Sequence, residues 1–152
     1  MGIAESRLDS FDLFAGLGSQ ELSFIAANCR EIEVGPENIL IQEGQVGKEV
    51  YLLESGSVRV FRGEAASPQD TAVLESPTIL GEMAMADPER IRTLSVVAES
   101  NLRLLSIPID TFLVFVRSCP LLKERIRRLI AARRLQPAAS QAAARMRCSA
   151  AA

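Results

Sequence analysis

The segment from Gly81 to Thr93 reads GEMAMADPERIRT and lies between two apolar runs that have the composition of β-strands. Gly81 allows the backbone to turn and to approach a ligand closely, and the helix-forming residues from Glu82 to Ala86 predict one short helical turn. The first amides of such a turn can donate hydrogen bonds to an anion. The segment therefore predicts a pocket for a phosphate.

Side chains from the same segment complete this predicted pocket. Arg92 returns at the start of the next apolar run, and its forked guanidinium matches the paired oxygens of a phosphate better than a lysine does. Thr93 adds a hydroxyl donor beside it. A phosphate would repel Glu82, so this carboxylate is better placed to accept a hydrogen bond from a sugar hydroxyl at the other edge of the ligand.

The order Gly-Glu-Met-Ala-Met, followed by Arg92-Thr93, resembles the phosphate-binding cassette of cyclic nucleotide-binding domains. The resemblance extends from about Phe14 to about Gln136. It departs from the family at Ile91, where a proline often precedes the arginine. It also departs at residues 76–80 (SPTIL), where many members carry a glycine and an acidic residue, so the mouth of the pocket is expected to have a different shape.

The resemblance implies specific ligand contacts. Arg92 would pair with the cyclic phosphate, and Glu82 would bind the ribose 2′-hydroxyl. Val60 and Leu74 are candidates for an apolar wall, with ordinary core packing as their alternative role. The expected ligand-binding residues are Gly81, Glu82, Met83, Ala84, Arg92, Thr93, Val60 and Leu74.

Short apolar runs with alternating polar residues predict the rest of the fold. Turn glycines, among them Gly44, Gly47 and Gly56, separate these runs, as expected for antiparallel strands. Ser19 reads as the N-cap of a preceding helix. These runs predict an antiparallel barrel or sandwich, and the resemblance implies that it is a β-roll. The predicted class is therefore α+β: an antiparallel, jelly-roll-like β-roll flanked by helices. The predicted boundaries are a helix at 19–29, the β-roll at 31–107 and helices at 109–136 in a domain of residues 1–136, then an alanine-rich tail at 137–152.

The last predicted helix has two kinds of surface. Its apolar stripe is expected to form a dimer seam or a lid over the pocket, since such a stripe needs a partner. Its basic residues are interpreted as a solvated face, with a phosphate backbone or a membrane surface as the alternatives. The apolar residues are Leu122, Ile126, Leu129 and Ile130, and the basic residues are Lys123, Arg125, Arg127, Arg128, Arg133 and Arg134.

The amino-acid composition argues against several classes of function. The 152 residues are 48% hydrophobic with a formal charge of −2, which fits one globular domain without the basic footprint of most nucleic-acid binders. The chain has no histidine, and Cys29, Cys119 and Cys148 are widely spaced, which argues against a zinc site or an imidazole-based triad. The cysteines predict reduced thiols in a cytoplasmic protein. No run predicts a membrane span or a signal peptide.

Together these features predict a regulatory module that senses cAMP or cGMP and is not an enzyme, with no metal and no cofactor beyond that ligand. In the bacterial transcription activator of this family, the residues that cap the base correspond to Ala138 and Ala139, which carry no side-chain donor or acceptor. The sequence therefore does not predict whether adenine or guanine is preferred. Too few residues follow the last helix for a DNA-binding domain. The alternative functions are a ligand-free interaction or dimerisation scaffold and, less compatible with length and charge, a DNA-binding regulator.

Overall fold

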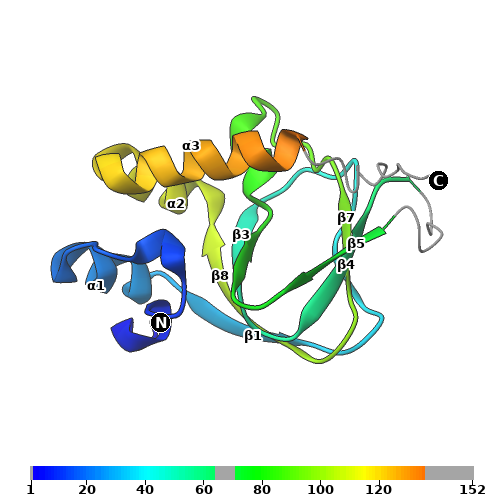
Figure 1. The fold of residues 1–152 in the computed structure, drawn as a ribbon, viewed down its shortest axis with the longest axis horizontal. Coiled ribbons are helices and arrows are strands. Elements are labelled where there is room, and N and C mark those ends of the chain that lie inside the picture. The colour runs from blue at the N-terminus through cyan, green and yellow to red at the C-terminus, as the bar shows by residue number, and fades with distance from the viewer. Residues whose placement is uncertain (1, 64–70, 136–152) are drawn as a thin grey trace.

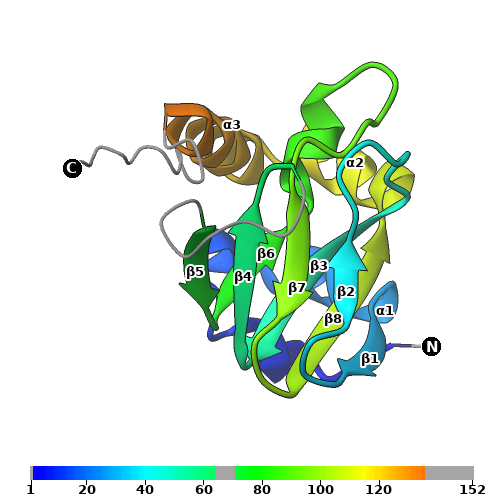
Figure 2. The same cartoon turned by 90° about the vertical axis from the view of Figure 1, so that its right-hand side faces the viewer.

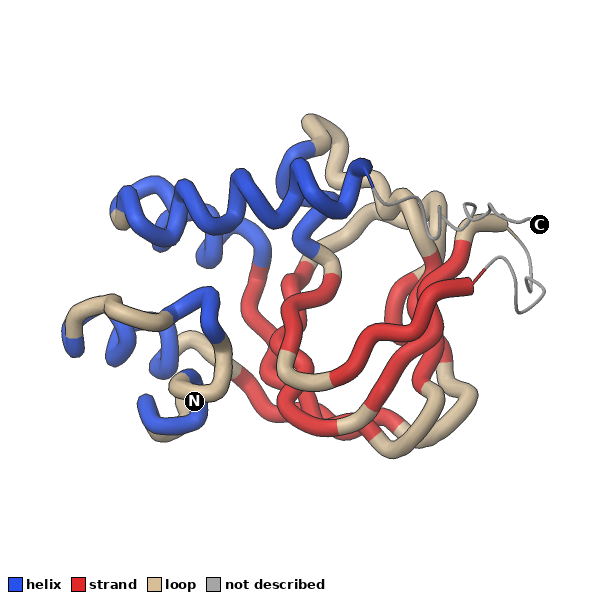
Figure 3. The backbone as a smooth tube through the Cα atoms, viewed as in Figure 1, coloured by secondary structure: helices blue, strands red, loops and turns tan. Residues whose placement is uncertain are grey.

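The structure is a computed structural model that describes residues 2–63 and 71–135. Helices gather on one side of a roll of strands (Figures 1 and 3). The strands are β1 (Arg30–Val34), β2 (Ile39–Ile41), β3 (Glu49–Ser55), β4 (Ser57–Phe61), β5 (Thr71–Glu75), β6 (Thr78–Leu80), β7 (Ser95–Ala98) and β8 (Leu102–Pro108). The helices are η1 (Glu5–Leu8), η2 (Asp12–Phe14), α1 (Ser19–Ala27), η4 (Glu82–Ala86), α2 (Ile109–Ser118) and α3 (Pro120–Leu135).

The strands form two four-stranded sheets, in the orders β1-β8-β3-β6 and β2-β7-β4-β5. All paired neighbours are antiparallel. Figure 2 looks onto the second sheet, with α3 lying across one end of the roll. This arrangement confirms the predicted α+β class and its jelly-roll-like antiparallel roll.

The central strands β3 and β8 are buried on both of their faces. Successive side chains of a strand point to opposite faces. Leu53 and Leu104 accordingly pack inside the roll, whereas their neighbours Leu52 and Leu105 pack against the helices. This double burial explains why these strands read as nearly continuous apolar runs, and it gives the chain two cores that share one sheet.

Helix α1 begins as the sequence predicts, but its cap differs. The N-cap is Gly18 and not Ser19, which is already the first helical residue. The amide of Gly18 donates to Oε1 of Glu21 at 2.6 Å. The glutamate at the third helical position thus accepts from the amide of the N-cap residue, which is the half of a capping box that needs no N-cap side chain.

The apolar stripe of α3 packs against the body of its own chain. Leu122, Ile126 and Ile130 are buried in the core between the helices and the first sheet, and Leu129 is partly buried there. The expectation that this stripe is a free dimer seam is therefore wrong, because the N-terminal helices and the roll already cover it. Leu121 is the exposed large apolar residue of α3, with 43% of its surface accessible.

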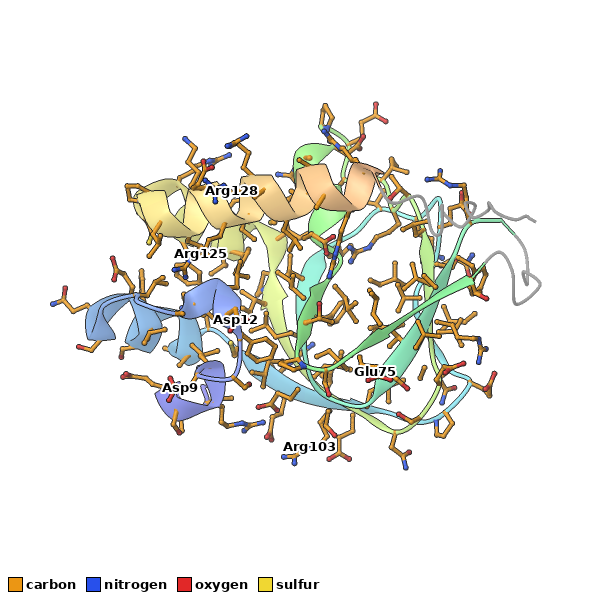
Figure 4. All side chains as sticks on the ribbon, viewed as in Figure 1. Asp9, Asp12, Glu75, Arg103, Arg125 and Arg128 are labelled. Carbon is orange, nitrogen blue, oxygen red and sulfur yellow. The ribbon has the colours of Figure 1, made fainter. Side chains whose placement is uncertain are left out.

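The basic residues of α3 do not form one solvated face. Arg127 and Arg128 are exposed and pair with Glu124, as a solvated surface requires. Arg125 instead points toward the N-terminal segment near Asp12 (Figure 4) and donates to the carbonyls of Asp12 and Leu13 at 3.2 and 3.0 Å. The solvated-face interpretation is thus wrong for Arg125, whose role is to hold η2 against α3. No helix within the described ranges is both long and apolar enough to cross a bilayer.

Adjacent leucines of α3 provide a test of this packing. Leu122→Ala should lower the free energy of unfolding by about 2–5 kcal/mol, since it empties a fully buried site. Leu121→Ala is the matched control, with an expected loss below about 1 kcal/mol because its side chain is already half exposed. Denaturant unfolding of both variants measures the difference. Equal losses would contradict the observed orientation of the helix.

Candidate functional site

A cavity of about 370 Å³ lies at the end of the roll beneath the C-terminal turns of α3. Its walls are largely apolar, and its polar groups come from the Gly81–Thr93 segment, from α3 and from the end of β4. The lining residues are Ile41, Val60, Arg62, Ala72, Leu74, Leu80, Gly81, Glu82, Met83, Ala84, Arg92, Thr93, Leu94, Val96, Arg133 and Arg134. An apolar cavity with a few convergent polar groups is the usual form of a small-molecule site.

The turn into this cavity requires a glycine. Gly81 has φ +84°, in the left-handed region that glycine enters without a steric cost. The 3₁₀ helix η4 follows at once, as the sequence predicted for a short helical turn, and it buries Glu82, Ala84 and Met85. The chain thus brings the first amides of η4 to the cavity wall. The amide of Thr93 also lines this wall and donates to no other group among the residues that the structure describes.

The guanidinium of Arg92 is buried and held by main-chain oxygens. Nη1 donates to the carbonyl of Gly81 at 3.0 Å, and Nη2 donates to the carbonyl of Glu49 at 2.7 Å. A guanidinium carries five N–H donors, so these two bonds leave others to face the cavity. Burial lowers the pKa of Arg92, and the neighbouring Tyr51, Glu82 and Glu49 act in the opposite direction. The usual pKa of an arginine is so far above neutral pH that the guanidinium stays charged.

Two glycines make room for Arg92. A Cβ on Gly47 would lie 2.5 Å from Cζ of Arg92, and a Cβ on Gly81 would lie 2.7 Å from its Nη1. Real side chains do not approach so closely, so any larger residue at either position would push the guanidinium away. The sequence marked Gly47 only as a turn residue. Its role as a surface on which the arginine lies became visible only in the fold.

The backbone beside Arg92 is fixed to the loop between β2 and β3. Its amide donates to the carbonyl of Gln45 at 2.8 Å, and its carbonyl accepts from the amide of Gly44 at 2.9 Å. At the tip of the segment, Oδ2 of Asp87 accepts from the amides of Glu89 and Ile91. These contacts close the tip without the proline that commonly precedes the arginine in the family.

The carboxylate of Glu82 is almost completely buried, with 2% of the residue exposed, and it faces Arg133 of α3. Nη1 of Arg133 lies 2.8 Å from Oε1 of Glu82. Arg133 also donates to the carbonyl of Ile79 at 2.6 Å and to Oγ1 of Thr78 at 2.8 Å. Oε1 of Glu82 is thus held by the charge of Arg133, and no donor of the described residues is aligned with it as in a hydrogen bond.

Arg133 is the main residue that sequence reasoning assigned wrongly. It was grouped with the solvated face of the last helix, but it reaches into the cavity and contacts the cassette. The periodicity of the helix contained the signal: Leu122, Ile126 and Ile130 form the buried stripe, and Arg133 continues it by one turn. Its contacts at Thr78 and Ile79 join α3 to the segment at residues 76–80.

The structure places all the predicted ligand-binding residues around the one cavity. These are Gly81, Glu82, Met83, Ala84, Arg92, Thr93, Val60 and Leu74. Sequence reasoning did not include Arg62, Arg133 or Arg134, which also line it. In the described ranges no group of three or more histidine, cysteine or acidic side chains is arranged to hold a metal. Burial raises the pKa of Cys29 to about 12, so this thiol stays protonated at neutral pH.

The ion pair between α3 and the cassette can be tested by stability. Arg133→Ala leaves a buried carboxylate without its cation and removes two further hydrogen bonds, so unfolding should become easier by about 1–3 kcal/mol. Arg128→Ala is the control, because it removes an exposed pair worth less than about 1 kcal/mol. Thermal melts of the unliganded variants give both values. If the two variants lose the same stability, the pair does not secure α3.

Comparison with known proteins matches residues 31–119, more than half of the chain, to the family profile of the cyclic nucleotide-binding domain. The cyclic AMP receptor protein of Thermus thermophilus is 31% identical over 127 residues, which cover 83% of this chain and 58% of that protein. The cAMP-dependent protein kinase regulatory subunit of Hypocrea atroviridis is 27% identical over 108 residues, which cover 71% of this chain and 22% of that protein.

Solved structures share the fold. A structure from Geobacter metallireducens, described as a cyclic nucleotide-binding protein, superposes with a TM-score of 0.70 at 21% identity and covers 86% of this chain and 94% of that one.

The chain spans 58% and 22% of the lengths of the two curated relatives, which therefore contain substantial further sequence. On the match to the family profile, the chain belongs to the family of cyclic nucleotide-binding domains.

Proposed function

We propose that this chain is a cyclic nucleotide sensor: it binds cAMP or cGMP in the cavity and transmits occupancy to the C-terminal helices. One observation carries the proposal. A buried guanidinium with further N–H donors, from Arg92, and a buried carboxylate, from Glu82, whose Oε1 is paired with Arg133 but lacks an aligned hydrogen-bond donor, line the same apolar-walled cavity. A sugar phosphate offers both an anion for the guanidinium and a hydroxyl for the carboxylate.

The cyclic phosphate would take the place beside Arg92. There it would meet the amides of Met83, Ala84 and Thr93 and the remaining donors of the guanidinium. Charge-assisted hydrogen bonds of this kind are stronger than neutral ones. An anion would also reduce the cost of burying the guanidinium, whose two hydrogen-bond partners are neutral carbonyls.

The ribose 2′-hydroxyl would donate to Glu82. A buried acceptor without a hydrogen bond costs free energy, so a ligand hydroxyl that supplies one gains more than it would in water. The apolar wall, which includes Val60 and Leu74, would then cover the faces of the sugar and base. These roles rest on the cavity geometry together with membership of the family.

Coupling to α3 would run through Arg133. A ligand hydroxyl would donate to the same carboxylate of Glu82 that Arg133 contacts, so a bound ligand would change the contact that anchors the last turn of α3. A ligand shifts an equilibrium only if it contacts the two states differently, and here the shared carboxylate provides that difference. We propose that binding selects one position of α3 and that a partner reads this position.

The names of the two curated relatives support a regulatory role, and we propose that this chain likewise has no catalytic activity of its own. Both names specify cAMP, but these proteins extend well beyond the matched region. Self-association through α3 stays a prediction. It would now have to use exposed residues such as Leu121, because Leu122 and Ile126 are buried.

Arg92→Leu tests the phosphate site. Losing a charge-assisted contact in a desolvated pocket costs about 2–5 kcal/mol, which corresponds to a loss of roughly 30-fold to several thousandfold in affinity. Titration calorimetry with cAMP and cGMP measures it, and Arg128→Leu is the control that removes a charge outside the cavity. Arg92 also donates hydrogen bonds to two main-chain carbonyls. Thermal unfolding of the unliganded variant must therefore show that the fold persists. Undiminished binding by Arg92→Leu would refute the site.

Glu82→Gln tests the ribose site separately. The change keeps the shape but weakens acceptance from a hydroxyl, so binding should lose about 1–2 kcal/mol. The loss should shrink against a 2′-deoxy cyclic nucleotide, because that ligand has no hydroxyl to donate. If neither cAMP nor cGMP raises the melting temperature of the wild type at millimolar concentration, the alternative function as a ligand-free scaffold is favoured.

A further inference from the structure

We propose that the cavity selects guanine over adenine, and that Arg62 and Arg134 are the residues that read the base. This inference rests on the proposed function, because it concerns the part of a cyclic nucleotide that the cassette does not contact. It starts from the two lining residues that neither the phosphate nor the ribose uses.

Arg62 and Arg134 come from distant parts of the chain to the same opening. Arg62 follows directly after β4, and Arg134 lies in the last turn of α3. Both line the cavity and both are exposed, which places them at its mouth. Figures 1 and 2 agree that the C-terminal end of α3 lies over the end of the roll where β4 finishes and β5 begins.

These two guanidinium groups have no partner among the described residues. Neither makes a hydrogen bond or an ion pair with any other described residue. Arg92 and Arg133, by contrast, are held by main-chain and side-chain oxygens deeper in the cavity. A ligand whose phosphate and sugar lie on the cassette would direct its base toward the remaining polar groups of the lining, which are Arg62 and Arg134.

The chemistry of a guanidinium distinguishes the purines. It carries donors and no acceptor, in a planar fork. Guanine presents two adjacent acceptors, O6 and N7, which match this fork, whereas adenine presents the N7 acceptor beside an N6 amino donor. The amino group of adenine would face a cation and find no partner in it.

The lining offers adenine no compensating acceptor near this mouth. Its hydroxyl and carboxylate side chains are Thr93 and Glu82, and both belong to the cassette. The other side chains that line the cavity are apolar or are arginines, within the described residues. The amino group of adenine gains no hydrogen bond from these guanidinium groups, so adenine should bind more weakly than guanine.

The test compares the affinities of cGMP, cAMP, cIMP and 7-deaza-cGMP by titration calorimetry. We expect the wild type to bind cGMP at least about fivefold more tightly than cAMP, the lower end of what one bidentate base contact provides. Cyclic IMP keeps both O6 and N7 and should bind within about threefold of cGMP. The 7-deaza ligand lacks one acceptor and should bind more weakly than cGMP.

The variants Arg62→Met and Arg134→Met, alone and combined, test whether these residues cause the preference for guanine. Removing positive charge weakens every anionic ligand alike, so the informative quantity is the ratio of the cAMP and cGMP dissociation constants. The double variant should bring this ratio close to one. Arg103→Met is the control: Arg103 is exposed on β8 at the edge of the roll away from α3 (Figure 4), and its loss should leave the ratio unchanged.

Three outcomes would overturn the proposal at different levels. Wild-type protein that binds cAMP as tightly as cGMP would refute selection of guanine while leaving the sensor function intact. A preference for cGMP that survives in the double variant would refute the roles of Arg62 and Arg134. Absence of binding by all four ligands would refute the proposed function itself, and this inference with it.

Discussion

The buried guanidinium of Arg92 is the constraint on which the rest of the site depends. A cation removed from water must be surrounded by acceptors, and here the carbonyls of Gly81 and Glu49 provide them. This arrangement requires the left-handed turn at Gly81 and the missing side chain at Gly47. It also joins the cassette to the loop before β3. One arginine thus links two segments that lie far apart in the sequence.

The pair formed by Glu82 and Arg133 connects this site to α3. A carboxylate so deeply buried is stable only with a charged partner or with hydrogen bonds. In the structure it has the charge of Arg133 at 2.8 Å, and the same arginine donates to Thr78 and Ile79. The contact therefore holds the last turn of α3 against the cassette.

The two cores explain why such an anchor can act on one element without disturbing the others. The interior of the roll and the helix-facing core share β3 and β8, whose strands are buried on both faces. A frame packed in this way resists small changes, since close-packed interiors tolerate little displacement. Helix α3 contributes one face to the helix-facing core and only its last turn to the cavity. The last turn is therefore the part of α3 through which the proposed response to a ligand would act.

The sequence alone determined the antiparallel roll, the helical turn after Gly81 and the residues of the cassette, because these follow from local periodicity, from turn chemistry and from a motif within one short segment. It did not determine the N-cap at Gly18, the burial of the α3 stripe within its own chain, or the position of Arg133. These depend on which distant segments meet: an arginine on a helix reads the same whether it faces water or Glu82. Only the tertiary structure decided that Arg62, Arg133 and Arg134 line the same cavity as the cassette, because their side chains converge through packing between elements and not through any spacing along the chain.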